Sequence, residues 1–346
     1  MVGSNYLVSI IIVTFNSAEY IKDCLNSVFK TDYPNFEVIV VDNGSIDETF
    51  KIVKEFPSVR LITSRKNLGY AGGNNLGAKK AKGEYLAILN PDTQVSSGWL
   101  QPLIRAINKP MIGVCQPKIM LDQKKKLLNL TGKTVHYLGF DWLTDFRKED
   151  YQIPKKELVS FSGSAFLILK EVFQKIGGFD RDYFMYFEDG DLSWRLRLAG
   201  YKLLFIPESV VYHEYKYQPK EEYQKARQKF YFLERNRLVT LIKNYSFKTL
   251  ILLCPVIKFM EKGMGFHFLS RGWWWEKPKG YFWIIKNLPT ILEKRKKVQK
   301  MRKFSDREIV KDFVSKIEFR EFDNFLLRNI ANPVLSFYWR LVKGFI

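Results

Sequence analysis

The stretch LVSIIIVTF (7–15) is a continuous run of apolar, mostly β-branched residues, and it decides the fold. A run without polar alternation is typical of a strand that is buried on both faces of a sheet. Residues 18–29 follow with apolar side chains at helical spacing, and FEVIVVD (36–42) is a second buried strand ended by the turn signal Asn43-Gly44-Ser45. The chain therefore begins as an alternation of strand and helix.

The same alternation continues to residue 92. Residues 46–56 show helical spacing, VRLIT (59–63) and YLAILNPD (85–92) are apolar strands, and the glycines of NLGYAGGNNLGAKKA (67–81) precede and enter a helix. Strand–helix alternation predicts an α/β fold with a mainly parallel central sheet and helices on both faces. In such sheets ligands bind beyond the carboxyl ends of the strands, where this chain places Asn16, Asp42, Asn43 and Asp92.

The next part of the chain is less regular. Residues 122–158 are polar and weakly periodic, and we expect them to form an excursion over the site. Beyond them the sequence predicts strands at 161–169, 202–206 and 209–213, and helices at 171–176 and 191–199.

The stretch GGFDRDYFMYFEDGDLSWRLR (177–197) concentrates acidic and aromatic side chains. Burial beside apolar groups and other carboxylates raises the pKa of a carboxyl group, which makes it a better proton acceptor near neutral pH. The structural alternative is an acidic loop that caps a helix starting near Asp191, since acidic residues favour helix N-termini. The five carboxylates are those of Asp180, Asp182, Glu188, Asp189 and Asp191.

Length and composition exclude several classes of protein. The 346 residues allow one large domain or two modest ones, and 46% apolar residues exclude a disordered chain. Cys24, Cys115 and Cys254 are widely spaced and form no C-x-x-C pair. This spacing argues against a disulfide framework or a structural zinc site and suits a reducing compartment. The first apolar run is too short for a signal peptide.

The net charge of +20 is concentrated in one segment. Residues 216–303 contain 22 Lys and Arg against 6 Asp and Glu, a net charge of +16, and they read as helical and basic. Trp273, Trp274, Trp275, Phe282 and Trp283 lie among these lysines, as in helices that bind a membrane surface. The alternatives are a helical subdomain with a solvated basic face and a nucleic-acid-binding segment, although no nucleic-acid-binding module is recognisable.

An apolar segment in the same region, FKTLILLCPVIKFM (247–260), is interrupted by Pro255 and Lys258. It falls short of the ~20 residues that a membrane-spanning helix needs. The sequence leaves open whether this segment enters a bilayer or packs on the core.

Five motifs occur in a fixed order: VSIIIVTFN (8–16), VVDNGSID (40–47), NLGYAGGNNLG (67–77), NPD (90–92) and GGFDRDYFMYFEDGDLSWR (177–195). Together they make the chain resemble the inverting family 2 glycosyltransferases of GT-A fold, especially their bacterial rhamnosyltransferase-like branch. The resemblance covers about residues 7–215 and continues more weakly through ERNRLVTLIKNY (234–245).

The resemblance implies a division into domains. Residues 1–217 would form the GT-A catalytic domain, with a nucleotide-sugar half over about 1–120 and an acceptor half over about 121–217. Residues 218–346 would form a basic, aromatic-rich helical extension that associates with a membrane.

The motifs also supply residues for a nucleotide-sugar donor. Asp42 closes a buried strand, where its carboxylate can accept the imide N–H of uracil or thymine, and Phe15 matches an aromatic position that can stack on the base. The glycine-rich loop lets the backbone approach a ligand, and its helix N-terminus favours phosphate. The alternative for Asp42 and Ser45 is turn formation and helix capping. The expected donor-binding residues are Thr14, Phe15, Asn16, Asp42, Asn43, Ser45, Asn67, Gly69, Gly72, Gly73 and Asn90.

A divalent cation is implied at Asn90-Pro91-Asp92, where the family usually carries an Asp-x-Asp motif. Such a cation, Mn²⁺ or Mg²⁺, would bridge the diphosphate and neutralise the charge on the leaving nucleotide. The first carboxylate is here the neutral Asn90, so Asp92 would be the main protein ligand. His213 matches a metal-binding histidine of the family, and a nitrogen ligand favours Mn²⁺; the alternative is a histidine packed at a strand end.

Glu188 and Asp189 match the acidic pair of the family, in which the aspartate is the general base. Asp189 would take the proton of the attacking acceptor hydroxyl, while Glu188 and Asp191 would position the acceptor or hold the loop. A pair of glycosidase carboxylates would not explain Asp42 or the glycine-rich motif. The chain lacks the Gln-x-x-Arg-Trp motif of the processive polymerases of this family, so transfer of one sugar per encounter is expected.

The sequence thus predicts a metal-dependent, inverting glycosyltransferase of cell-surface polysaccharide synthesis, peripherally attached to the cytoplasmic face of the cell membrane. The donor would be dTDP-rhamnose or, second, a UDP-sugar, and the acceptor a glycan or a lipid-linked glycan. No nucleic-acid partner is expected. Two rival hypotheses are a non-catalytic nucleotide- or sugar-binding scaffold of the same fold and a basic nucleic-acid-binding protein.

Overall fold

The computed structural model describes residues 6–121, 126–214, 223–318 and 324–346. These residues form two compact units. The first unit contains the described residues of Met1–Lys133, Leu143–Leu196 and Tyr201–Tyr217, and the second those of Thr134–Trp142, Arg197–Gly200 and Gln218–Ile346. The expected division into domains 1–217 and 218–346 stays a prediction, since its boundary lies outside the described residues.

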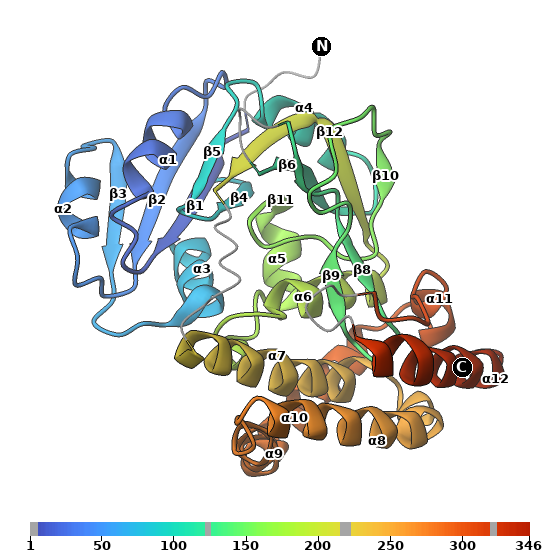
Figure 1. The fold of residues 1–346 in the computed structure, drawn as a ribbon. Helices are drawn as coiled ribbons and strands as arrows, with labels where there is room; N and C mark the ends of the chain where they lie inside the picture. The colour runs from blue at the N-terminus through green and yellow to red at the C-terminus, as the bar shows by residue number, and fades with distance from the viewer. Residues whose placement is uncertain (1–5, 122–125, 215–222, 319–323) are drawn as a thin grey trace. The chain divides into compact units, whose positions relative to one another are not determined.

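The first unit is built on one mixed sheet of ten strands (Figure 1). Eight strands follow the order β10-β12-β6-β11-β4-β1-β2-β3, while β5 pairs with β12 and β7 pairs with β6. The bounds are β1 Val8–Thr14, β2 Phe36–Asp42, β3 Val59–Thr63, β4 Tyr85–Leu89, β5 Thr93–Val95, β6 Ile112–Met120, β7 Leu128–Leu130, β10 Lys156–Glu157, β11 Ala165–Leu169 and β12 Lys202–His213.

Strand β1 lies inside this sheet and is buried on both faces. It pairs in parallel with β2 and β4, and β2 pairs in parallel with β3. Ile10 and Ile12 face a core that includes apolar residues of helices α1 (Ile21–Val28) and α4 (Leu100–Ile107). Ile11 and Val13 face the opposite side, where helix α3 (Gly69–Lys80) packs. The expectation of a sheet with helices on both faces is therefore confirmed.

The glycines of α3 allow this helix to lie unusually close to the sheet. A Cβ atom on Gly73 would come within 2.6 Å of a Val13 methyl group, and one on Gly77 within 2.5 Å of an Ile11 methyl group. Real Cβ contacts are longer because protein interiors are close-packed without overlap. At these two positions, the glycine-rich motif serves helix–sheet packing.

The remaining helices of the first unit differ in extent from the expected ones. Helix α2 is Thr49–Lys54, α5 is Lys170–Ile176, the 3₁₀ helix η1 is Arg181–Tyr183 and α6 is Glu188–Leu198. Helix α6 thus begins at Glu188, three residues before the position that the sequence suggested, so its first turn contains three acidic residues. These acids favour the positive end of the helix dipole.

The sheet is mixed, since β11 is antiparallel to both β4 and β6, while β1, β2, β3 and β4 pair in parallel, as do β6 and β12. One strand prediction is wrong. The two strands expected at 202–206 and 209–213 are one strand, β12, with a register shift between Ile206 and Val210. The excursion at 122–158 contains β7, β10 and the hairpin strands β8 (Lys133–Val135) and β9 (Asp141–Leu143) among its described residues. Short polar strands lack the long apolar runs on which the predictions relied.

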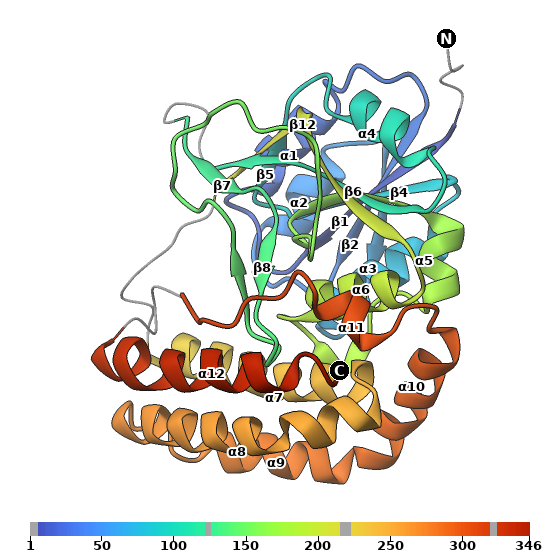
Figure 2. The same cartoon turned by 90° about the vertical axis from the view of Figure 1, so that its right-hand side faces the viewer.

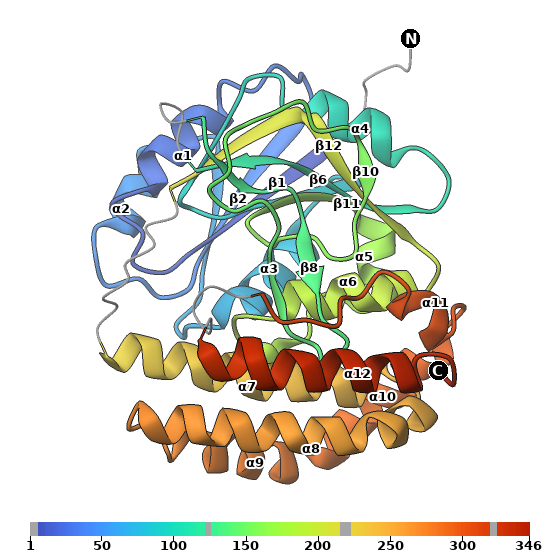
Figure 3. The same ribbon diagram turned by 45° about the vertical axis from the view of Figure 1, so that its right-hand side comes forward.

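The second unit is mainly helical (Figures 2 and 3). Helix α7 packs against α9 and α10, and α8 lies beside α12. Helix α8 continues through Pro255, whose ring nitrogen cannot donate to the preceding turn. The bounds are α7 Tyr223–Asn244, α8 Phe247–Ser270, α9 Glu276–Lys286, α10 Leu288–Met301, α11 Asp306–Val310, the π-helical turn η3 Leu327–Ala331 and α12 Asn332–Val342.

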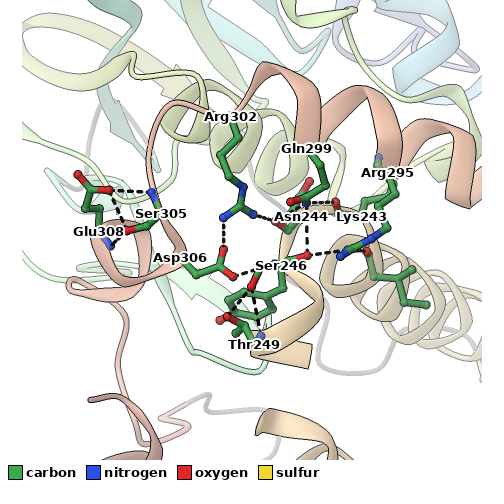
Figure 4. A network of polar contacts seen from close by, with 12 residues as sticks. Lys243, Asn244, Ser246, Thr249, Arg295, Gln299, Arg302, Ser305, Asp306 and Glu308 are labelled. Carbon is green, nitrogen blue, oxygen red and sulfur yellow. Dashed lines mark hydrogen bonds and ion pairs between the residues drawn. The ribbon is translucent and has the colours of Figure 1, made fainter. Parts of the chain in front are cut away.

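Two arginine side chains of this unit cap the C-terminal end of helix α7 (Figure 4). The carbonyl groups of the last turn of a helix have no partner within the helix and attract cations. Arg295 donates to the carbonyl oxygen of Tyr245 at 2.6 Å, and Arg302 donates to that of Asn244 at 2.5 Å. Arg302 also pairs with Asp306, which accepts from the backbone N–H of Ser246. These two arginines are therefore structural.

The aromatic residues of the basic segment divide into buried and exposed ones. Trp273 is buried against Phe230 and Phe268, and Trp283 is half-buried with the Arg235 guanidinium 4.2 Å from its ring. The side chains of Trp274, Trp275 and Phe282 are exposed. In the ranges that the structure describes, no helix combines the length and the apolar character needed to cross a membrane.

The close packing of α3 predicts opposite effects for two helical glycines. In Gly77→Ala the new methyl group would overlap Ile11, at a cost of about 1–3 kcal/mol, while alanine favours a helix interior by about 1 kcal/mol. We expect a net loss of about 1 kcal/mol in the free energy of unfolding. Gly263 of α8 has open space around its Cβ position, so Gly263→Ala should be neutral or stabilising. Urea denaturation of both variants measures the difference; equal effects would contradict the packing argument.

Candidate functional site

The carboxyl ends of β1 and β2 bring three of the expected donor-binding residues together. Thr14 and Asp42 are register partners in the parallel pair, and the Thr14 hydroxyl donates to Asp42 Oδ1 at 3.2 Å. The backbone N–H of Ser45 donates to the same atom at 3.3 Å, and so does the Ser45 hydroxyl. These three bonds fix the carboxylate at Oδ1, and Oδ2 takes part in none of them. The turn contacts that were the alternative explanation for Asp42 and Ser45 are therefore present, and they also orient the Asp42 carboxylate.

Asn16 and Asn43 build the surrounding loops. Asn16 has a positive φ of 52°, its backbone N–H donates to the Ser45 hydroxyl at 2.9 Å, and its side-chain oxygen accepts from the N–H of Ile46. Asn43 is buried and its amide donates to the carbonyl oxygen of Gly69 at 3.1 Å. Phe15 is 46% exposed at this edge of the sheet, so its ring is available to stack on a planar ligand.

The glycine-rich loop is held by the protein itself. The side-chain oxygen of Asn67 accepts from the N–H of Gly69 at 2.8 Å, and the N–H of Ala71 donates to the carbonyl oxygen of Phe184. Gly69 has a positive φ of 69°, and a Cβ atom there would lie 2.3 Å from the Phe184 oxygen. Two N–H groups at the start of α3 are therefore already used, which leaves less of this helix N-terminus for phosphate than the sequence suggested. A Cβ on Gly72 would meet only Leu68.

Asp92 and His213 meet where β5 pairs with the end of β12, in the register Thr93 to His213. His213 Nε2 lies 3.2 Å from Asp92 Oδ1. His213 Nδ1 lies 3.2 Å from the side-chain oxygen of the buried Asn129. Asn90, two residues before Asp92, is anchored through its backbone N–H to the Ser164 carbonyl oxygen at 2.9 Å, and its side chain is half-buried.

This pair fits a cation. In the tautomer that donates from Nδ1 to the Asn129 oxygen, Nε2 carries a lone pair beside Asp92 Oδ1. Two lone pairs then face each other at 3.2 Å, an arrangement that a cation would relieve. Asp92 Oδ1 is buried and accepts no hydrogen bond from the described residues. Two atoms that bind one metal ion at about 2.1 Å lie about 3 Å apart, close to the spacing found here.

Within the described ranges, no three His, Cys, Asp or Glu side chains gather as metal ligands. A cation at Asp92 and His213 would therefore take its other ligands from substrate oxygens and water. This is how Mg²⁺ and Mn²⁺ commonly bind together with phosphates.

Asp189 lies in a cradle of hydrogen-bond donors in the first turn of α6. Its Oδ1 accepts from Lys133 Nζ at 2.8 Å and from the backbone N–H of Gly190 at 2.7 Å, and its Oδ2 accepts from the N–H of Gly163 at 2.8 Å. The residue is 6% exposed. Lys133 Nζ also lies 2.8 Å from Oδ2, so donors contact both oxygens of this carboxylate.

Two other acidic residues flank this carboxylate. Glu188 is buried in the first turn of α6, and Asp191 is fully buried. Asp191 accepts from Arg195 Nε at 2.8 Å and from the Tyr183 hydroxyl at 3.2 Å. Arg195 also donates to the carbonyl oxygens of Ile176 and Gly178. Asp191 is thus bonded to two side chains of the acidic stretch, as its expected loop-holding role would require; its role stays a prediction. Asp180 accepts from the N–H of Asp182 and so starts η1.

The loop before α6 is strained. Phe184, Tyr186 and Phe187 all have positive φ angles between 64° and 68°, a conformation that costs a residue with a side chain about 1–2 kcal/mol. Contacts with α3 offset this cost. The Asn75 side chain makes two hydrogen bonds with the backbone of Phe179, at 2.7 and 2.9 Å. The glycine-rich and acidic motifs are thus joined directly.

Three further site residues were missed by sequence reasoning. Tyr70 donates to the carbonyl oxygen of Gly163, the residue whose N–H holds Asp189. Burial, and then the negative charges of Glu188 and Asp189, raise the pKa of Tyr70 well above its usual range, so it remains a donor. Tyr70 could have been found inside the glycine-rich motif. Lys133 and Asn129 lie in the excursion at 122–158, where no pattern marks them.

The family model described as "Glycosyl transferase family 2" matches residues 9–177. This match includes Asp42, the glycine-rich loop and Asp92, and it ends before Asp189. Among curated proteins, the chain is similar to an N-acetylglucosaminyl-diphospho-decaprenol L-rhamnosyltransferase of Mycobacterium tuberculosis. The two are 29% identical over 229 residues, which are 59% of this chain and 75% of the relative.

Solved structures of glycosyltransferases have the same fold. The structure of GalNAc-T7 with UDP, GalNAc and Mn²⁺ matches at a TM-score of 0.55 and 20% identity, over 68% of this chain and 47% of that one. The mannosyltransferase PcManGT from Pyrobaculum calidifontis, in complex with GDP-Man and Mn²⁺, matches at a TM-score of 0.52 and 16% identity, over 86% and 87% of the two chains. The fold of the first unit is therefore the GT-A fold, and the chain spans about half of the length of GalNAc-T7.

The cradle of Asp189 predicts an energetic coupling with Lys133. The side chains of both residues are buried, at 9% and 11% exposure. Lys133→Met leaves the carboxylate without its counter-charge and should lower the free energy of unfolding by about 3 kcal/mol. Lys133→Met combined with Asp189→Asn should lose less than the sum of the two single losses.

Urea denaturation of the two single variants and the double variant measures this coupling. The exposed pair Lys51–Glu48, at 2.8 Å, provides the control, since Lys51→Met should change stability by about 1 kcal/mol or less. Additive losses at Lys133 and Asp189 would contradict the pairing.

Proposed function

We propose that the protein, whose residues 9–177 match the model of glycosyl transferase family 2, transfers one sugar from a nucleotide-diphospho-sugar to a hydroxyl group of a glycan or lipid-linked acceptor, with inversion at the anomeric carbon. The observation that carries this proposal is the buried Asp189 carboxylate, which is held by three donors in the unit that also contains Asp42 and the Asp92–His213 pair. A donor site, a cation site and a base are the parts that such a transfer needs.

The donor base would stack on the exposed ring of Phe15 and donate its imide N–H to Asp42. The carboxylate suits this role because Thr14 and Ser45 hold it through Oδ1, so no reorientation is needed on binding. Uracil and thymine both carry an imide N–H, whereas adenine has none. We therefore expect a UDP- or dTDP-linked donor, with dTDP-rhamnose first because of the similarity to a rhamnosyltransferase.

A divalent cation would be held by Asp92 and His213, with the Asn90 side chain available as a neutral oxygen ligand. Such an ion would neutralise the charge that develops on the departing nucleoside diphosphate. In the tautomer whose Nδ1–H donates to Asn129, Nε2 would be available to bind the ion. The nitrogen ligand favours Mn²⁺ over Mg²⁺, and Mn²⁺ accompanies the nucleotide ligands in GalNAc-T7 and PcManGT.

Asp189 would act as the general base. The acceptor oxygen forms a bond to the anomeric carbon while the bond from that carbon to the diphosphate oxygen breaks. The hydroxyl proton passes to the Asp189 carboxylate, and the nucleoside diphosphate leaves on the opposite face. Lys133, Gly163 and Gly190 aim the carboxylate, and a positioned base of this kind contributes about 10²–10⁴-fold to the rate. Glu188 would support the acceptor.

The second unit would hold the enzyme at a membrane, where a lipid-linked acceptor resides. Exposed aromatic residues among lysines, such as Trp274, Trp275 and Phe282, favour an anionic lipid surface. We place the protein on the cytoplasmic face of the cell membrane, in the synthesis of a cell-surface polysaccharide, with peripheral attachment.

Replacing the base should abolish transfer while leaving donor binding intact. In Asp189→Asn we expect sugar transfer to fall about 10³-fold, because the amide cannot accept the proton. The affinity for UDP or dTDP should change little. Transfer of radiolabelled sugar and calorimetric nucleotide binding measure the two effects. Asp182→Asn, in the same acidic stretch, is the control and should retain activity. Loss of nucleotide binding in Asp189→Asn would refute the assignment.

Replacing the cation ligand should weaken donor binding only when metal is present. We expect Asp92→Ala to bind the nucleotide about tenfold or more weakly than the unmodified protein in Mn²⁺, and equally well in a chelator. Asp23→Ala, an exposed carboxylate of α1, is the control. Calorimetry in Mn²⁺ and in EDTA gives the comparison, and an equal loss under chelation would exclude metal ligation.

A further inference from the structure

The C-terminal helix of the second unit, formed by η3 and α12, is apolar on two opposite sides. Its inner side is buried and includes Leu335 and Trp339. Trp339 stacks on Tyr137 with ring centroids 4.4 Å apart, and the Tyr338 hydroxyl donates to the Leu252 carbonyl oxygen of α8 at 2.6 Å. The helix is therefore firmly attached to its own unit.

The outer side carries six large apolar residues at helical spacing, which we call the apolar stripe. Each of them is between 40% and 67% exposed. A helix that is apolar all round is normally covered on every side, and a contiguous exposed apolar surface marks a binding site. The members of the stripe are Leu326, Ile330, Val334, Phe337, Leu341 and Phe345.

Positive charge flanks the apolar stripe. Residues 324–346 contain no Asp or Glu, and they contain Arg328, Arg340 and Lys343. A cavity of about 660 Å³ adjoins the stripe at Phe337; among the described residues its lining includes the basic Lys316, Arg328 and Arg340 and one carboxylate, that of Glu318. Such a cavity suits a phosphate group.

The neighbouring helix α8 also carries exposed apolar residues together with exposed lysines. Its exposed face carries Phe247, Ile251 and Phe266 together with Lys248 and Lys262. The two helices lie side by side in Figures 2 and 3, in agreement with the bond from Tyr338 to Leu252. Apolar side chains between cations thus extend beyond one helix.

We propose that the apolar stripe enters the headgroup layer of an anionic bilayer and that the adjoining cavity binds the phosphate of a lipid headgroup. An interfacial helix buries its apolar side among the acyl chains while its cations meet the lipid phosphates. The proposal deepens the membrane partner named under the proposed function and rests on it, but it does not depend on the transfer reaction.

The charges favour lipid over a second copy of the chain. A twofold contact between copies would place the same patch on both sides, so that Arg340 and Lys343 would face like charges, and residues 324–346 contain no carboxylate side chain to offset them. Nucleic acid would satisfy the cations, but it would leave the aliphatic residues of the stripe without an apolar partner. A bilayer surface offers both anionic and apolar groups.

Flotation of the full chain with vesicles tests the proposal. Vesicles of phosphatidylcholine mixed with phosphatidylglycerol should bind the protein, and vesicles of phosphatidylcholine alone should bind it weakly. Phe337→Ser combined with Leu341→Ser should lower the affinity about tenfold or more. Arg328→Gln combined with Arg340→Gln should lower the affinity for anionic vesicles about fivefold for each charge removed. Added salt should reduce the difference in affinity between this charge variant and the unmodified protein.

Matched changes in the first unit serve as controls. Met111→Ser with Tyr151→Ser removes two exposed large side chains, and Arg105→Gln with Lys109→Gln removes two exposed cations; both should bind vesicles like the unmodified protein. Binding of UDP, measured on every variant, reports an intact first unit independently of lipid. If the variant with Phe337→Ser and Leu341→Ser does not fold, the variant with Arg328→Gln and Arg340→Gln tests the proposal, because it alters only exposed guanidinium groups.

Three results would overturn the proposal. These are no preference for anionic vesicles, equal binding by the stripe variants and their controls, or self-association in sedimentation that the stripe variants abolish without any vesicle binding. The last result would assign the stripe to a second copy of the chain. Because no donor or acceptor is present, none of these results bears on the transfer reaction.

Discussion

The first unit depends on the close approach of helix α3 to strand β1. Gly73 and Gly77 allow this approach, since a side chain at either position would overlap Val13 or Ile11. Once α3 is seated, its other residues organise the site. Asn43 reaches the carbonyl oxygen of Gly69 near the start of α3, and Asn75 holds the backbone of Phe179. Tyr70 fixes the peptide that holds Asp189. One packing constraint thus connects the donor edge of the sheet with the acidic stretch.

The buried carboxylates of the site differ in how they are compensated, and this difference separates their roles. Asp191 is fully buried and paired with Arg195, so it supports the loop. Asp189 is held by one cation and two backbone N–H groups. Asp92 faces an imidazole nitrogen in a geometry that a cation would stabilise. Burial of a charge without compensation would cost several kcal/mol, so each arrangement indicates what the carboxylate is for.

The sequence predicted the parts of this structure that follow from long apolar runs and short motifs. Strands β1, β2 and β4 follow from LVSIIIVTF (7–15), FEVIVVD (36–42) and YLAILNPD (85–92). The helices on both faces follow from the alternation of strand and helix. Lys133 and Asn129 could not be predicted, because their roles arise from contacts with residues more than fifty positions away. The apolar stripe was missed since periodicity shows which side chains share a helix face, whereas only tertiary packing shows which face is already covered.

The central claim is that the first unit binds a pyrimidine nucleoside diphosphate through Asp42 and a divalent cation through Asp92 and His213. The most direct measurement is the thermal stability of the full chain with UDP, dTDP, GDP or ADP, each in Mn²⁺ and in a chelator. A ligand at a hundredfold excess over its Kd stabilises a protein by about 2.7 kcal/mol, so binding is readily detected. The account predicts stabilisation by UDP or dTDP that requires Mn²⁺. No stabilisation by any nucleotide, or equal stabilisation under chelation, would contradict it.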